Sequence, residues 1–371
     1  MWLVTSHAGC TTVLSDGRFS ASLGQRTRTR DDELPVSMLT SDPPDHSRLR
    51  GPGALLLGPA ALRGAAGDIR AAASRVLDGL DGRDEADAAA DIGEPFAVEV
   101  FTLLLRLTPG DRAAFADLAR RVSVNLDPLA GPAAGRAGAT AVEEFCAFMD
   151  AHIRALEAAA VDCPLTRLAG DGRLTRAEML GVLSLAVVGG FLPLADLAGH
   201  AVHRIEASGM TLGFLRDSPP QPPAQGQGGG TDGARPAARE DVMTSRVVDE
   251  LMRLATPIPF AARVTREAVE LDGAALPAGA SVLVLTAAAN RDPAVFDRPD
   301  VFDPDRSPNP HLAFGTGPHL CLGAPLVRLA GGALLGELAA RFPRVHQLGP
   351  AQWDKPLVPR RLHGQRLALA S

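Results

Sequence analysis

Lysine and tyrosine are almost missing from this sequence. Among 371 residues, Lys355 is the only lysine, tyrosine does not occur, and aromatic residues make up 4% of the chain. Arginine supplies nearly all of the positive charge, a skew typical of GC-rich codon usage rather than of any chemistry. The formal net charge is −6, so no basic field covers the surface. We therefore expect no nucleic-acid partner.

Cysteine is also scarce, and its spacing excludes two classes of site. Cys10, Cys146, Cys163 and Cys321 are far apart and form no CxxC pair. Neither a disulfide framework nor a zinc site is indicated, and a reducing cytoplasm fits this usage. The start, MWLVTSHAGC, lacks a basic region followed by a long apolar stretch, and no run reaches about 18 apolar residues. We expect a soluble cytoplasmic protein that does not contact a membrane.

Hydrophobic residues are plentiful, at 46% of the chain, and Ala, Leu and Val dominate among them. This composition favours helices, so we expect a mainly α fold with a small β-sheet region, built as one domain over residues 1–371. Helical spacing of apolar residues predicts helices within 44–80, 86–160, 175–205, 241–254 and 324–342. Thr175 and Glu178 form a capping box that opens the third of these.

Two other kinds of segment complete the expected organisation. Short alternating strands are predicted over 268–285, and a terminal hairpin near 362–369. After the long central helix and before these strands, residues 217–238 are too rich in Pro, Gly and Gln to pack. This composition predicts a disordered loop.

The most informative stretch runs from Phe314 to Gly323, directly before the last long helix. A thiolate at Cys321 would be stabilised by backbone N–H groups and by the positive end of that helix. Phe314 could cover the sulfur, and His319 could reach an anionic group beside it. The neighbouring glycines, which let the loop lie against a flat macrocycle, are Gly315, Gly317 and Gly323. The alternative is a buried structural thiol in a glycine-rich turn.

This FGxGxHxCxG pattern resembles the heme-binding loop of the cytochrome P450 family, and the resemblance covers nearly the whole chain. It implies heme b as cofactor, Cys321 as the iron ligand, and Phe314, Gly315, His319 and Gly323 as parts of the binding loop. The run from Asp42 to Arg50 resembles the family segment in which a His and an Arg four residues later bind the heme propionates.

By that resemblance the propionates are bound by His46 and Arg50, and a further propionate-binding arginine is Arg263. Glu250-Leu251-Met252-Arg253 resembles the family's ExxR motif, and Arg306 matches its partner arginine in a buried structural ion network. ExxR by itself is weak, because a solvated salt bridge on a helix has the same pattern.

The central helix departs from the family pattern of an acid followed by Thr, which relays protons during dioxygen activation. Leu192 stands in place of the acid, and Pro193 in place of Thr. Pro193 has no N–H for the carbonyl of Gly189, so a kink and a groove are expected without the hydroxyl. Three explanations stay open: substrate or water supplies protons, the reaction needs no ordinary oxygen insertion, or catalysis is lost.

Two more side chains of this helix are candidates for the distal pocket. Asp196 is a possible proton source or substrate contact, with a polar residue bonded to carbonyls or water as the alternative. Phe191 could approach the pocket, or it could pack in the core.

Three surface features also depart from relatives. The chain begins with the segment 1–16, which we expect to leave an open sheet edge. Residues 51–57 lack the basic residues that often dock an acidic ferredoxin. In the segment 20–40, Arg26, Arg28 and Arg30 predict a solvated charged face, with contact to a carrier protein or acidic substrate as the alternative.

The resemblance implies an oxidative enzyme of specialised metabolism that uses dioxygen and electrons from a ferredoxin or flavodoxin and its reductase. The favoured reaction is hydroxylation or epoxidation of a small-molecule substrate, which a carrier protein could hold, by a monomeric enzyme. One alternative is oxidative coupling, cyclisation or rearrangement. The other is a non-catalytic heme protein or recruitment module.

Overall fold

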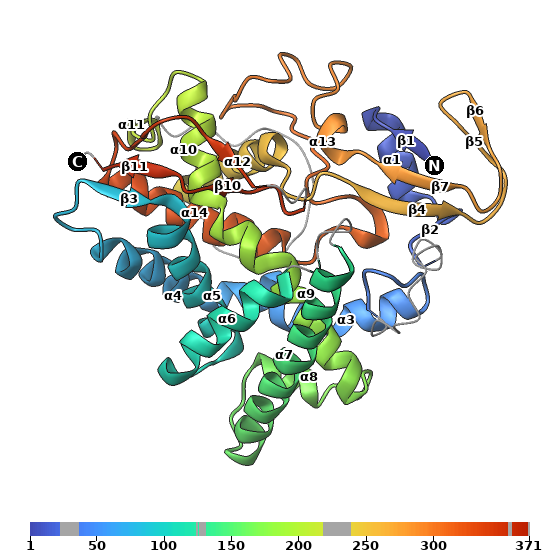
Figure 1. The fold of residues 1–371 in the computed structure, drawn as a ribbon, viewed down its shortest axis with the longest axis horizontal. Coiled ribbons are helices and arrows are strands. Elements are labelled where there is room, and N and C mark those ends of the chain that lie inside the picture. Colours follow the sequence, from blue (N-terminus) through green and yellow to red (C-terminus); the bar gives the residue numbers. More distant parts are fainter. Residues whose placement is uncertain (23–36, 124, 126–130, 218–238, 355–357, 370–371) are drawn as a thin grey trace.

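The computed structural model describes residues 1–22, 37–123, 125, 131–217, 239–354 and 358–369, and helices dominate them (Figure 1). The helices are α1 (His7–Ser15), α3 (Asp45–Leu57), α4 (Pro59–Asp78), α5 (Glu94–Leu105), α6 (Arg112–Ser123), α7 (Pro132–Ala158), α8 (Pro164–Ala169), α9 (Arg176–Ala195), α10 (Leu197–Ala207), α11 (Phe214–Asp217), α12 (Arg239–Ala255), α13 (Thr286–Ala289) and α14 (Ala324–Arg341). Shorter helical turns are η1 (Ala88–Gly93), η2 (Pro109–Asp111) and η4 (Gly317–His319). The mainly α expectation is confirmed.

Strands gather in small sheets beside the helices. One sheet has the order β1-β7-β4-β2, built from Trp2–Val4, Ser281–Val284, Ala261–Thr265 and Phe19–Ser20. β1 pairs in parallel with β7 and has no strand on its other side among the described residues, so the expected open edge is present. β5 (Val269–Leu271) and β6 (Ala274–Leu276) form a separate hairpin through Asp272 and Gly273.

The expected terminal hairpin is wrong, because its two strands join different sheets. β10 (Leu362–His363) pairs with β9 (Gln352–Trp353), whereas β11 (Arg366–Ala368) lies between β3 (Glu85–Asp87) and β8 (His346–Gln347). Two-residue pairing along β10 gives little local energy, so contacts with distant strands decide the arrangement.

The central helix α9 crosses the middle of the molecule, in contact with α3, α5, α6, α7 and α14 (Figure 1). The predicted capping box is present: the Thr175 hydroxyl accepts from the Glu178 N–H, and the Glu178 carboxylate accepts from the Thr175 N–H. The helix predicted to reach Ile205 is divided at Asp196 into α9 and α10.

The stretch 176–207 is long and apolar enough to cross a membrane by length and composition, but 67% of its most apolar window is buried inside the protein. This burial is typical of the core helix of a globular protein.

Two predictions fall wholly or mostly outside the described residues. The loop predicted over 217–238 begins at Asp217, the last residue of α11, and the rest of it is not described. Arg26, Arg28 and Arg30 also lie outside the described residues.

Candidate active site

The loop before α14 has a backbone that only glycine adopts easily. Gly315 and Gly317 have φ angles of 69° and 70°, in the left-handed region. A Cβ on Gly317 would also lie 2.6 Å from the carbonyl oxygen of Leu14. The Cys321 N–H donates to the Phe314 carbonyl over 2.8 Å, which closes the loop. These contacts hold Cys321 just before the first turn of α14.

Cys321 is exposed on the described chain, unlike Cys10 and Cys163, which are buried. The surrounding protein partly desolvates its thiol and raises the pKa, while the N–H groups of Gly323 and Ala324 and the charge of Arg50 oppose this rise. An accessible sulfur that faces N–H donors and an arginine can bind a cation as a thiolate.

Phe314 lies beside this sulfur-bearing loop and is almost fully buried. Its ring contacts the imidazole of His311, with ring centres 5.4 Å apart, and the guanidinium of Arg328 lies 5.0 Å from the ring centre. These contacts hold the Phe314 ring in place beside the loop.

Four side chains that can carry positive charge gather next to Cys321, from α3, β4 and η4. We name this set the cationic cluster; its members are His46, Arg50, Arg263 and His319. The imidazoles of His46 and His319 lie with ring centres 4.2 Å apart. Burial lowers the pKa of all four, and for His319 burial together with the smaller effect of neighbouring positive charges lowers it to about 4.

Carboxylate partners do not balance the cationic cluster among the described residues. The carboxylate near it, Asp42, already accepts from the hydroxyls of Ser20 and Ser22 and from Arg266. His46 is buried, and its Nε2 has no hydrogen-bond partner within the described part of the chain, while the guanidinium of Arg263 donates to the carbonyl of Ala262.

Withdrawing the guanidiniums of this cluster from water, that of Arg263 almost fully and that of Arg50 in part, is costly unless an anion accompanies them. The cluster therefore fits a ligand that carries carboxylates.

The ExxR pattern forms the buried network that the resemblance implied. Both oxygens of Glu250 accept from the guanidinium of Arg253 at 2.8 Å, and the Nε of Arg306 lies 3.1 and 3.2 Å from the same oxygens. Asn309 also donates to this carboxylate. Arg253 donates in addition to the carbonyls of Asn290, Pro299 and Val301, so the network ties α12 to the irregular chain before the cysteine loop.

In the middle of the molecule, the described residues cover one face of α9 only in part. Its half-buried residues recur at helical spacing, and we name them the open face of α9: Leu185, Ala186, Gly189, Gly190 and Pro193. Leu185 and Leu322, the neighbour of Cys321, pack against the same small cluster around Val182. The first residue of the open face and the residue after Cys321 therefore share one packing cluster.

The three residues predicted for the distal pocket lie in three different surroundings. Pro193 lies on the open face. Phe191 is fully buried, with ring centres 6.2 Å from Phe101 and 6.1 Å from Phe115, so it packs between α5 and α6. These contacts favour the core-packing alternative for Phe191.

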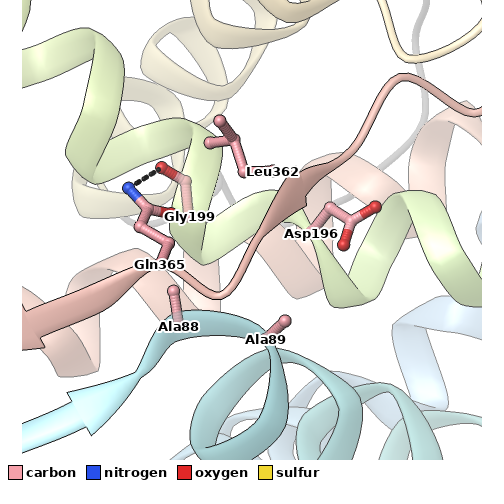
Figure 2. Close-up of a pocket in the computed structure, with 6 residues that line it drawn as sticks. All are labelled: Ala88, Ala89, Asp196, Gly199, Leu362 and Gln365. Carbon is pink, nitrogen blue, oxygen red and sulfur yellow. Dashed lines mark hydrogen bonds between the residues drawn. The ribbon is translucent and has the colours of Figure 1, made fainter. Parts of the chain in front are cut away.

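Asp196 forms a buried ion pair that the sequence did not indicate. Its carboxylate lies 2.8 Å from the Nε of Arg361, whose guanidinium also approaches Glu94. Burial raises the pKa of Asp196 to about 6, against the opposing effect of Arg361. Figure 2 shows Asp196 at the rim of a small pocket, with its carboxylate directed away from Gly199 and Gln365.

That pocket is not the cofactor site, because neither Cys321 nor any residue of the open face lines it. Its lining residues are Ala88, Ala89, Asp196, Gly199, Leu362 and Gln365.

Comparison with known proteins decides the family. The cytochrome P450 family model matches residues 242–348, which contain the ExxR network and the cysteine loop. Nocardicin C N-oxygenase of Nocardia uniformis subsp. tsuyamanensis is 32% identical over 367 residues, which are 95% of this chain and 84% of the relative. The chain belongs to the cytochrome P450 family.

Other P450 proteins agree with this assignment. The 20-oxo-5-O-mycaminosyltylactone 23-monooxygenase of Streptomyces fradiae is 32% identical over 92% of this chain and 77% of its own length. The crystal structure of the P450 enzyme CYP109B1 from Bacillus subtilis superposes with a TM-score of 0.83 at 25% identity, covering 100% of this chain and 93% of that one. The P450 assignment makes the chain a heme b oxidoreductase of the monooxygenase type.

The residues present fit heme b. A flat macrocycle with two propionates would satisfy the cationic cluster and the unpartnered Nε2 of His46, while Cys321 is accessible to the iron. Sequence reasoning missed Arg361, the partner of Asp196. No local signal could have found it, because 165 positions separate the two residues.

Proposed function

We propose that Cys321 binds the iron of heme b and that the cationic cluster binds its propionates. Phe314, Gly315 and Gly323 shape the loop that presents the sulfur. The observation that carries the proposal is an accessible cysteine beside the buried His46 and Arg263 and the half-buried Arg50 and His319, which have no carboxylate hydrogen-bond partner among the described residues. When bound, heme b supplies the oxidising chemistry, with dioxygen and two electrons as co-reactants.

The distal side of this P450 would position substrate rather than relay protons. Along the open face of α9 the side chains of Leu185, Ala186 and Pro193 carry no acidic or hydroxyl group. The reaction we infer is hydroxylation or epoxidation of a specialised metabolite, with protons supplied by substrate or ordered water. The second candidate is oxidative coupling, cyclisation or rearrangement without oxygen insertion, which the replacement of acid and Thr by Leu192 and Pro193 supports.

For Asp196 we propose a structural role. Its carboxylate is nearly fully buried and paired with Arg361, so direct contact with substrate is not its first role. We infer that it holds the strand segment near Arg361 against the end of α9.

We infer that a ferredoxin or flavodoxin, together with its reductase, delivers electrons to this protein. The substrate would be a small molecule, free or attached to a carrier protein. We also infer that residues 1–371 act as one domain, as a monomer in the cytoplasm, with no nucleic-acid partner and no membrane contact.

The test is the carbon monoxide difference spectrum of the purified protein, reduced in parallel by dithionite and by NADPH with a surrogate ferredoxin and reductase. We expect a red-shifted Soret band in both samples, its loss in Cys321→Ala, and its retention in the control Cys146→Ser on α7. A band with dithionite alone would favour a different electron source or the non-catalytic module. Absence of the band from wild-type protein that has bound heme would overturn thiolate ligation.

A further inference from the structure

Asp249 and Glu250 are adjacent on α12, yet their carboxylates bind separate partners. Glu250 accepts from Arg253 within the buried network, whereas one oxygen of Asp249 accepts from the Nε of Arg328 on α14 over 2.8 Å. The Nε2 of His311 lies 3.4 Å from the same oxygen of Asp249. The carboxylate of Asp249 therefore joins two side chains from the segments on either side of the cysteine loop.

The hydrogen bonds of His311 determine which of its ring nitrogens carries the proton. Its Nδ1 accepts from the N–H of Ala313 over 3.3 Å. A ring nitrogen that accepts a hydrogen bond carries no proton, so the proton lies on Nε2, which faces Asp249. We name His311, Asp249 and Arg328 the carboxylate triad. By this geometry its two charges are the carboxylate of Asp249 and the guanidinium of Arg328.

The carboxylate triad encloses Phe314, whose backbone closes the cysteine loop. The guanidinium of Arg328 lies over the Phe314 ring, 5.0 Å from its centre, and the imidazole of His311 contacts the same ring. The carbonyl of Phe314 accepts from the N–H of Cys321 over 2.8 Å. The triad is therefore one aromatic residue away from the backbone that carries the sulfur.

The charge of Arg328 reaches the sulfur of Cys321. Burial raises the pKa of Cys321, and the charge of Arg328 is one of the smaller effects that oppose this rise. The side chain of Arg328 is 37% exposed and that of Asp249 is 25% exposed, so water screens both charges only in part. Because the two groups lie 2.8 Å apart, their opposite charges largely cancel at the sulfur, and either charge alone would not be cancelled.

We propose that Asp249 is a positioning residue that fixes the charge of Arg328 beside Cys321 and thereby sets the reduction potential of bound heme. The proposal rests on the proposed function, since it requires that Cys321 binds the iron. A positive charge near the iron favours the reduced state, which carries one positive charge less, and a negative charge opposes it. The balance within the triad therefore decides how readily an electron donor can reduce this protein.

The test is a redox titration of the purified, heme-bound protein without substrate at low ionic strength. Asp249→Asn leaves the charge of Arg328 uncompensated, so the potential should rise. Arg328→Gln leaves the charge of Asp249 uncompensated, so the potential should fall. Each change should alter the equilibrium constant for one-electron reduction by about threefold to tenfold, the size expected of one partly screened charge. The double variant should return close to the wild-type potential.

Two control variants separate the charge of the triad from other effects. Arg298→Gln removes an exposed arginine that pairs with Asp297, so it changes the net charge as Arg328→Gln does and should leave the potential unchanged. His311→Gln removes a ring that contacts Phe314 without changing the charge, and it should move the potential less than either charged variant.

Opposite signs are the decisive observation. If Asp249→Asn and Arg328→Gln move the potential in the same direction, or if neither moves it, the proposal is overturned. A shift in His311→Gln as large as theirs would show that packing around the loop governs the potential, and it would also overturn the proposal. The two opposite shifts should shrink when the salt concentration rises from about 0.01 M to about 0.5 M, because both charges are partly exposed.

Failure of this inference is distinguishable from failure of the proposed function. Variants that keep the red-shifted carbon monoxide band and the wild-type potential retain thiolate ligation, and the triad then has no electrostatic role. A heme-bound wild-type protein without the band fails the function test, whatever the potentials of the variants are.

Discussion

Glu250 and Arg253 face each other one turn apart on α12, with both carboxylate oxygens 2.8 Å from guanidinium nitrogens and neither side chain exposed. Removing one member of such a buried pair leaves the other charge without compensation. The pair therefore contributes to the stability of the segment that leads to the cysteine loop.

Glu250→Ala should lower the free energy of unfolding by about 3–5 kcal/mol, because Arg253 and Arg306 both lose their carboxylate. Urea unfolding of the heme-bound protein measures the change. The control is Glu270→Ala on β5, whose side chain is exposed and should change stability little. Equal effects of the two substitutions would contradict the role of the network.

Arg263→Met should accelerate loss of heme by about 10–100-fold, because a charge-assisted hydrogen bond to a propionate contributes about 1.5–3 kcal/mol. Heme transfer to excess apomyoglobin gives the rate. Arg298→Met removes an exposed arginine that pairs with Asp297, and it should release heme at the wild-type rate. Equal rates of heme loss in the two variants would contradict the binding of a propionate by Arg263.

Asp196 should make stability fall as the pH rises. The pKa of this carboxyl is about 6 in the folded protein and 3.8 ordinarily, so the folded state binds the proton more tightly. Its stabilising contribution is full below about pH 3.8 and is lost as the pH rises through about 6. The difference between these two pKa values corresponds to at most about 3 kcal/mol in the free energy of unfolding.

Urea unfolding of wild type and Asp196→Asn at pH 4, 5, 6 and 7 tests this sign. The stability of wild type relative to the variant should decline across that range. Asp42 is the control, because its pKa is shifted in the opposite direction. Burial raises the pKa of Asp42, but hydrogen bonds from Ser20, Ala21 and Ser22 and the charge of Arg266 together lower it to about 2. The advantage of wild type over Asp42→Asn should therefore shrink as the pH falls below about 4. A pH-independent difference for Asp196→Asn would refute the raised pKa.

Phe191→Ala should destabilise the protein by about 3–5 kcal/mol, because it opens a cavity between Phe101 and Phe115. The carbon monoxide band should keep its position, since the ring packs away from the open face. Leu55→Ala, on the exposed side of α3, is the control for a truncation that leaves no cavity. A shifted band without a loss of stability would instead place Phe191 in the distal pocket.

Local patterns predicted the parts of the site that lie close in sequence. The left-handed glycines beside Cys321, the capping box at Thr175 and the ion pair of Glu250 and Arg253 are each encoded within a few residues. The ion pair of Asp196 and Arg361 could not be predicted, because its geometry depends on how the last strands pack. The side of α9 that Phe191 occupies likewise depends on α5 and α6, which periodicity alone does not place.

The pairing of β1 with β7 and of β11 with β3 has a consequence for how this chain folds. Each ladder joins segments about 280 residues apart in the sequence. Such contacts have high contact order and form slowly, since a long loop must close before they give any stabilisation. During synthesis, β3 must wait for residues 366–368 to leave the ribosome before it can pair with β11. The strands, rather than the helices, therefore set the last step of assembly.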